Sequence, residues 1–128
     1  MDHSINNGWD NSKGGMYNAG YYFKGSDSIT IIDNGKDWWG QAETLNSMLL
    51  FSKLFPGEKK YYQDFLKQWE YMKTWLIDHE YGGWYYRGLD NNPESKKMNK
   101  TSDWKVNYHE TRALMNCIEM LTDEKRRE

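Results

Sequence analysis

Three stretches of the chain carry apolar residues at helical spacing. The first begins at Trp38 and is stopped by Phe55-Pro56-Gly57, the second covers about residues 59–78, and the third opens near Tyr108. Apolar side chains three and four positions apart lie on one face of a helix, and that face is buried against a neighbour. The pattern therefore predicts a mainly α-helical chain. The apolar positions are Ala42, Leu45, Met48, Leu49, Leu50 and Leu54, then Tyr62, Phe65, Leu66, Trp69, Met72 and Leu76, then Ala113, Leu114, Cys117, Ile118 and Leu121.

The segment before the first helix has a different pattern. Short aromatic runs over residues 15–23 are followed by turn-forming residues 24–28 and by the β-branched run 29–32, which together predict a β-hairpin. The first ten residues are polar and rich in Gly and Asn, so we expect a loop there. Residues 90–101 are also loop-like, and we expect residues 1–14 and 123–128 to be mobile.

The chain repeats itself at intervals of 66 to 68 residues. Each unit consists of a Gly-Gly hairpin, an Asp-Trp pair and a helix, and a further helix links the two units. Units of this kind bury their apolar faces only against neighbouring units, so the pattern predicts part of a helical toroid or solenoid. We expect one domain over residues 1–128. The matching pairs are Gly14-Gly15 and Gly82-Gly83, Asp37-Trp38 and Asp103-Trp104, and Glu43-Thr44 and Glu110-Thr111.

Composition excludes several functional classes. The chain has 17 basic and 19 acidic residues, and the basic ones are scattered, which argues against nucleic-acid binding. No apolar run is long enough to cross a bilayer, and we expect a cytoplasmic location. The single cysteine, Cys117, forms no internal disulfide, and no His, Cys or carboxylate group has metal-ligand spacing. We therefore expect neither a metal nor another cofactor.

Aromatic residues make up 16% of the chain although hydrophobic residues make up only 38%. Rings that line a wet cleft are typical of sugar sites, because an aromatic face stacks on the C–H face of a pyranose. Ordinary core packing is the alternative. The tryptophans that could stack on a sugar are Trp38, Trp39 and Trp104. One member of the Trp38-Trp39 pair must point away from the cleft.

Two polar clusters, residues 36–43 and 103–112, begin equivalent helices. If those helices run parallel, both clusters lie at one end of the assembly. An imidazole suits proton abstraction near neutral pH, so His109 is a candidate base, although it could also be a structural residue at the helix start. Glu43 could orient a base, bind a hydroxyl or cap its helix. Lys36 and Lys105 could bind hydroxyls or anions, but we expect them to be solvated.

These clusters resemble the motifs of one family. Residues 37–43, Asp-Trp-Trp-Gly-Gln-Ala-Glu, resemble the Trp-Trp-x-Gln-Ala-Glu segment of the N-acylglucosamine 2-epimerase and cellobiose 2-epimerase family. Residues 104–113 resemble its Trp-Lys-x-x-Tyr-His-x-x-Arg segment, and residues 8–15 and 81–85 match in order and spacing. The resemblance implies part of an α/α barrel of antiparallel helices with short hairpins at the mouth, and reversible inversion at C2 of an aldose or N-acyl hexosamine.

The same resemblance implies roles for individual residues. His109 would be a general acid/base, and Trp104 with Trp38 or Trp39 would line the sugar site. Glu43 would lie in the same cleft. Tyr108 and Arg112 belong to the matching segment and would contact substrate, with a structural role as the alternative for Arg112.

Family members are much longer, and this chain resembles only their C-terminal third. Their second catalytic histidine has no counterpart here, and inversion at C2 needs a base on each face of the sugar. We therefore expect a truncated isomerase, inactive alone, that either forms a homo-oligomer or requires the N-terminal part of the barrel. Two alternatives remain: a non-catalytic carbohydrate-binding or interaction module, and an α/α-barrel glycoside hydrolase. The hydrolase would use two carboxylates among Asp37, Glu43, Asp103 and Glu110.

Overall fold

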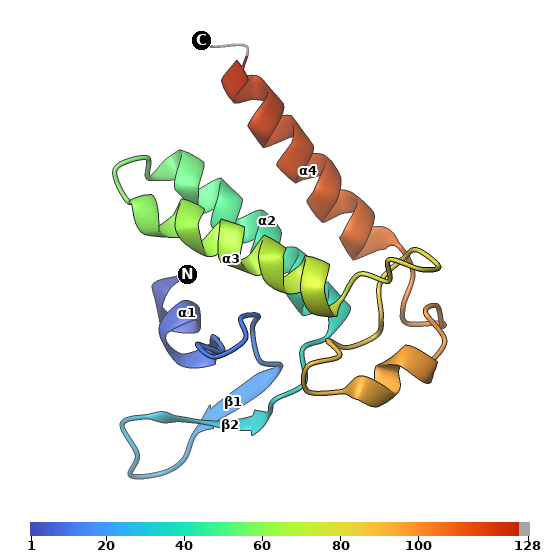
Figure 1. Ribbon diagram of the computed structural model, residues 1–128. Helices are drawn as coiled ribbons and strands as arrows, with labels where there is room; N and C mark the ends of the chain where they lie inside the picture. The colour runs from blue at the N-terminus through green and yellow to red at the C-terminus, as the bar shows by residue number, and fades with distance from the viewer. Residues whose placement is uncertain (126–128) are drawn as a thin grey trace.

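Two parallel helices and one antiparallel helix form the body of the molecule (Figure 1). The computed structural model describes residues 1–125. α2 and α4 lie side by side and begin at the same end, and α3 packs on α2 in the opposite direction. The elements are α1 (Asp2–Gly8), β1 (Ala19–Tyr22), β2 (Ile29–Asp33), α2 (Trp38–Leu54), α3 (Lys59–Trp75), the 3-10 helix η1 (Pro93–Lys97) and α4 (Tyr108–Lys125).

α2 is the central helix, because α3 covers one of its faces and α4 covers another. A helix with neighbours on two sides needs apolar residues over most of its circumference. The sequence supplies them, and the core of the molecule gathers around this helix. The buried residues of this core include Ala42, Leu45, Met48 and Leu49 from α2, Phe65, Met72 and Leu76 from the α3 side, and Ala113 and Cys117 from α4.

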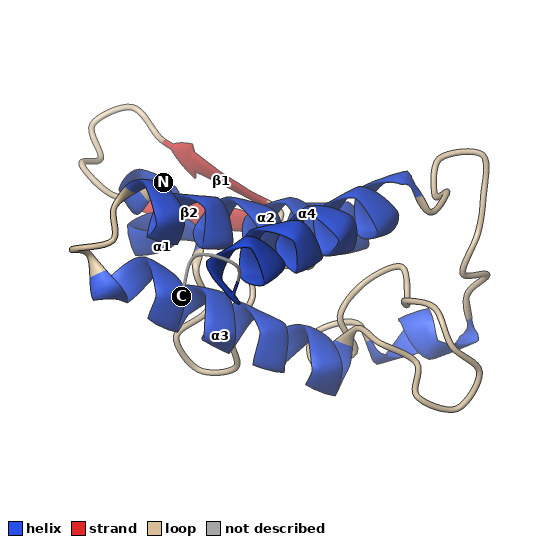
Figure 2. Cartoon of the chain, turned by 90° about the horizontal axis from the view of Figure 1, so that it is seen from above, coloured by secondary structure: helices blue, strands red, loops and turns tan. Residues whose placement is uncertain are grey.

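The predicted hairpin and three predicted helices are confirmed, with differences at their ends. β1 and β2 pair antiparallel, with an irregular register between Ala19 and Gly20. α3 ends at Trp75 rather than near residue 78, because Asp78 already belongs to a turn. The segment 90–101 contains η1, and Figure 2 shows this long connection at one end of the helices. Residues 126–128 of the predicted mobile tail lie outside the described part of the chain.

The prediction of a loop at the start of the chain is wrong, because residues 2–8 form α1. The reason is tertiary contact that a local pattern does not contain. The Asp2 carboxylate accepts a hydrogen bond of 2.8 Å from the Tyr61 hydroxyl of α3, and Ile5 and Trp9 pack against the core. Local preference for a loop is weak enough for such contacts to override it.

The sequence repeat is also a repeat in three dimensions. The Asp10 and Asp78 carboxylates each accept backbone N–H groups two and three residues ahead, and each turn then passes through a Gly-Gly pair with positive φ. Residues with a Cβ atom rarely adopt a positive φ, so glycine is required at these positions. Each turn also binds a lysine through the aspartate and a glycine carbonyl. Lys36 binds the first turn and Lys100 the second.

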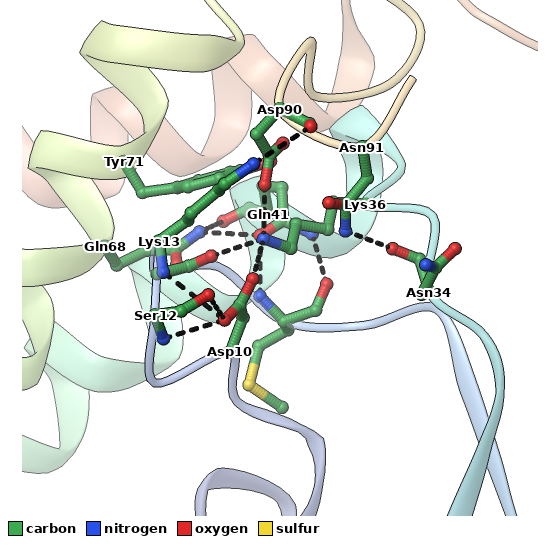
Figure 3. Close-up of polar contacts among 12 residues, drawn as sticks. Asp10, Ser12, Lys13, Asn34, Lys36, Gln41, Gln68, Tyr71, Asp90 and Asn91 are labelled. Carbon is green, nitrogen blue, oxygen red and sulfur yellow. Dashed lines mark hydrogen bonds and ion pairs between the residues drawn. The ribbon is translucent and has the colours of Figure 1, made fainter.

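Lys36 lies at the centre of a buried polar cluster, which Figure 3 shows. It is fully buried, and its Nζ lies 2.8 Å from Asp10, 2.7 Å from the Gly14 carbonyl and 2.6 Å from Asp90. The Tyr71 hydroxyl donates to the other oxygen of Asp90 at 2.9 Å. Burial would raise the pKa of Asp10, but hydrogen bonds from Lys36 and Ser12 outweigh it and hold that pKa far below its ordinary value. This cluster fixes the chain immediately before α2.

An amide side chain fixes α2 itself. Gln41 accepts the Met16 N–H at 3.0 Å and donates to the Met16 carbonyl at 2.9 Å, and Gln68 of α3 donates to Gln41 at 3.1 Å (Figure 3). The segment before β1 is thereby held against the first turn of α2. The Lys36 cluster thus holds the segment before α2, and the amide clamp holds the first turn of α2.

Candidate functional site

The two polar clusters meet where α2 and α4 begin. Glu43 of α2 lies against His109 of α4, with Glu43 Oε1 at 2.7 Å from His109 Nδ1. The same oxygen accepts a hydrogen bond from the Arg112 guanidinium, one turn further along α4. The prediction that both clusters lie at one end of the assembly is confirmed. The repeat brings together residues that are 66 positions apart in the chain.

Electrostatics determine the proton positions in this cluster. Burial would raise the pKa of Glu43, but hydrogen bonds from His109 and Arg112 outweigh it and lower that pKa. Glu43 is therefore ionised near neutral pH and can only accept hydrogen bonds. His109 Nδ1 must then carry the proton that it shares with Glu43. This leaves the other ring nitrogen, Nε2, unprotonated in the neutral ring and able to accept a proton.

Aromatic rings surround the histidine. The Trp39 ring centroid lies 6.1 Å from that of His109, and the Tyr108 ring meets His109 edge-on at 5.1 Å. The Arg112 guanidinium lies 5.3 Å from the centre of the Tyr108 ring. Trp39 is 44% exposed and Tyr108 is 59% exposed, so both offer a ring face to a ligand.

A cavity of about 470 Å³ adjoins this cluster and shares Trp39 and Glu43 with it. Its other walls are Met16 to Asn18, positioned by Gln41, and Met1 and Ser4 around α1. The lining does not include His109. Trp39 and Glu43 therefore belong both to the cavity and to the cluster around His109, and α1, which sequence reasoning missed, contributes a wall.

The structure does not bring all predicted site residues together. Trp38 is only 4% exposed and packs on Tyr86 with ring centroids 4.6 Å apart, so it is the member of the pair that points into the core. Trp104 is 86% exposed and lies in the loop before α4. Trp39 is the tryptophan next to His109. The sequence did contain the signal, because Trp39 and Glu43 are four positions apart and share a helix face.

Glu110 follows His109 in the sequence but is not its partner. Its carboxylate points to Lys105, with Oε1 at 2.9 Å from Nζ, and both side chains are buried. The expectation that Lys36 and Lys105 are solvated is wrong, because each is buried beside a carboxylate. Lysine side chains are seldom buried in proteins, so the sequence alone favours a solvated lysine. Burial becomes favourable when a carboxylate pairs with the ammonium group, as it does for both residues.

Among residues 1–125, no group of three or more His, Cys, Asp or Glu side chains is arranged to hold a metal ion. No helix in the described part of the chain is long and apolar enough to span a membrane.

The arrangement of helices matches solved structures. The crystal structure of a D-mannose isomerase superposes with a TM-score of 0.75 at 32% identity, over 95% of this chain and 29% of that one. A cellobiose 2-epimerase from Spirochaeta thermophila superposes with a TM-score of 0.61 at 27% identity, over 75% of this chain and 23% of that one. The fold is thus a portion of an α/α barrel.

Sequence comparison gives the family. Residues 1–113 match N-acylglucosamine 2-epimerase (GlcNAc 2-epimerase), and the chain belongs to this family. A D-mannose isomerase from Marinomonas mediterranea is 35% identical over 122 residues, which is 95% of this chain and 29% of that protein. A cellobiose 2-epimerase from Bacteroides fragilis is 28% identical over 110 residues. The chain spans less than a third of the length of these relatives.

Proposed function

We propose that this chain carries one of the two proton-transfer sides of a sugar 2-epimerase or aldose isomerase, with His109 as the base. The observation that supports this most is the 2.7 Å contact between His109 Nδ1 and Glu43. An ionised carboxylate on Nδ1 orients the imidazole, keeps Nε2 free, and stabilises the imidazolium that forms when Nε2 takes a proton. Trp39 and Tyr108 would hold the sugar over this nitrogen.

The chemistry begins at the carbon next to the carbonyl of an open-chain sugar. Nε2 of His109 takes the proton from C2, the C–H electron pair forms a C1–C2 double bond, and the carbonyl oxygen becomes negatively charged. Return of a proton to the opposite face of C2 gives the epimer. Return of the proton to C1, with the O2 hydroxyl proton passing to O1, gives the ketose. Inversion needs a donor on the second face. Transfer between C1 and C2 on one face can use a single base.

The hydrolase alternative loses its support. Of the four carboxylates that sequence reasoning named, Glu110 is paired with Lys105, Asp37 lies 2.6 Å from Arg87, and Glu43 is held by His109 and Arg112. The fourth, Asp103, is exposed in the loop before α4. A glycosidase needs two carboxyl groups that flank the glycosidic bond, and three of the four are engaged by basic side chains. A sugar-binding role without catalysis remains as an outcome of the test below.

Deuterium uptake from D₂O, followed by NMR, tests the proposal. The sugars would be glucose, mannose, N-acetylglucosamine, N-acetylmannosamine and cellobiose. Because a general base contributes about 10²–10⁴-fold, the His109→Ala variant should exchange slower by that factor. Label at C2 of the epimer and label at C1 of a ketose distinguish the two reactions. Equal exchange in His109→Ala would contradict the assignment. Sugar binding without exchange in either protein, even with the remaining part of the barrel added, would favour a binding module.

A partner is part of the proposal. Met115 and Ile118 on α4 are 63% and 64% exposed, and such an apolar face tends to associate with other protein. We propose that the working site forms when further protein covers this face, either a second copy or the part of the barrel that this chain does not match. The exchange assay should therefore be repeated with that part of the D-mannose isomerase added as a separate polypeptide. Sedimentation of the chain alone tests self-association.

A further inference from the structure

The segment that carries His109 into the site is held by a single buried side chain. Between residues 101 and 108 every residue is exposed except Lys105, which is 1% exposed. Its exposed neighbours include Trp104 at 86% and Val106 at 58%. A lysine is the residue least expected to anchor a loop by burial, because its charge must leave water. Its position therefore has to be explained by what it binds.

Lys105 forms an ion pair with Glu110, and His109 lies between these two residues in the sequence. Its Nζ donates to Glu110 Oε1 at 2.9 Å, and Glu110 lies in the first turn of α4. The ion pair closes residues 105–110 into a short loop with His109 inside it. The backbone of the preceding segment is also folded back on itself, since Ser102 N–H donates to the Lys105 carbonyl at 3.1 Å. Lys105 is thus fixed at both its main chain and its charged end.

The same ammonium group contacts α2. Lys105 Nζ lies 5.3 Å from the centre of the Trp38 ring, and Trp38 is the first residue of α2. A cation over an indole face is attracted to it, more strongly when both are away from water. Through its ion pair with Glu110 and its contact with the Trp38 ring, Lys105 therefore links the start of α4 to the start of α2. Those are the helices that supply His109 and Glu43.

The pair is not arranged for maximal stability. Glu110 Oε2 and Trp38 Nε1 are buried, and neither has a hydrogen-bond partner within residues 1–125. Leaving a buried acceptor or donor unpaired costs free energy, and replacing a buried ion pair by apolar residues is often neutral or stabilising. Stability alone does not explain why a lysine and a glutamate occupy these positions.

We propose that Lys105 and Glu110 are positioning residues, which set the distance between His109 and Glu43 by pinning the first turn of α4 to the first turn of α2. The inference rests on the proposed role of His109. It concerns the geometry of the free protein, so it can fail or hold whether or not the chain exchanges a sugar proton.

The state of the His109 ring in solution tests the inference. The full chain has three histidines, so ¹⁵N and ¹H resonances of His109 can be assigned by comparison with His109→Ala. In the unaltered chain we expect the Nδ1–H tautomer, with a low-field proton resonance from the bond to Glu43. The double variant Lys105→Met/Glu110→Leu keeps the packing volume and removes the ion pair. We expect it to fold, to lose the low-field resonance, and to shift His109 toward the Nε2–H tautomer.

A matched control separates positioning from general loosening. Glu110→Gln and Asp90→Asn each turn a carboxylate beside a buried lysine into an amide, but Asp90 belongs to the Lys36 cluster. We expect Glu110→Gln to weaken the His109 resonance and Asp90→Asn to leave it unchanged. These two variants also decide the matter should the double variant not fold. An unchanged resonance in a folded double variant or in Glu110→Gln would overturn the inference, as would equal loss in Asp90→Asn.

Discussion

The two repeat units have the same turn but differ in what surrounds it. Lys36 and Lys100 each bind the aspartate and a glycine carbonyl of their own turn, and each lies near tyrosine rings. Lys36 has a second carboxylate, Asp90, and its side chain is fully buried, whereas the Lys100 side chain is 28% exposed. The second carboxylate comes from the following unit. The local sequence determines the turn, and the neighbouring unit determines whether the lysine leaves water.

The repeated glutamates differ in the same way. Glu43 and Glu110 occupy equivalent positions on α2 and α4, yet Glu43 faces His109 and Arg112 while Glu110 pairs with Lys105 in the interior. The difference follows from the residues around them. α4 places a histidine and an arginine beside Glu43, and a lysine takes the other carboxylate. One repeated motif thus provides the site with an orienting group and the scaffold with an ion pair.

The largest expected effect is the loss of Lys36. Lys36→Met would leave Asp10 and Asp90 buried without a counter-charge, and breaking a buried pair in this way costs about 3–5 kcal/mol. We expect urea unfolding to show a loss of that order. Lys100→Met, the matched change in the second unit, should cost much less, because water already reaches that side chain. Equal losses would mean that the second carboxylate does not distinguish the units.

The equivalent glutamates should separate activity from stability. Glu43→Gln removes the charge that orients His109, and proton exchange at C2 of a responsive sugar should slow about 10²-fold. Its side chain is 30% exposed, so the free energy of unfolding should change little. Glu110→Gln, with its side chain 10% exposed, should lower the unfolding free energy and, because Glu110 positions His109, should slow the exchange as well. Urea titration and the exchange assay on both variants give the comparison, and identical profiles would contradict it.

Much of the fold was predictable because α2, α3 and the hairpin have patterns that are local in sequence. The start of α1 was not, since Asp2 depends on Tyr61, 59 positions away. In the site, Glu43 and His109 were found through the repeat and the family motifs. The partner of Arg112 was not predictable, because helix spacing on α4 says nothing about which side chain of α2 it meets. The burial of Lys105 was indicated in the sequence only by the glutamate five positions later, Glu110.

The smallest effect is expected in acid. The hydrogen bond from Lys100 lowers the pKa of Asp78 to about 2, and backbone N–H groups of Tyr81 and Glu80 add to it. An aspartate with a lowered pKa in the folded state stabilises the protein above its unfolded value of about 3.9, and that stabilisation is lost as pH falls through the folded value. Unfolding free energy should therefore decline between about pH 4 and pH 2.

The variants identify which turn causes the decline. Lys100→Met removes the largest contribution to the lowered pKa of Asp78, so the fall in stability between pH 4 and pH 2 should become shallower. Asp10 has a pKa further below its ordinary value because Lys36 and Ser12 overcome its burial, so its contribution persists to lower pH. Asp10→Asn should therefore lower stability at both pH 7 and pH 3, with the smaller loss at pH 3. A pH slope in Lys100→Met identical to that of the unaltered chain would show that the exposed lysine does not set the charge state of its turn.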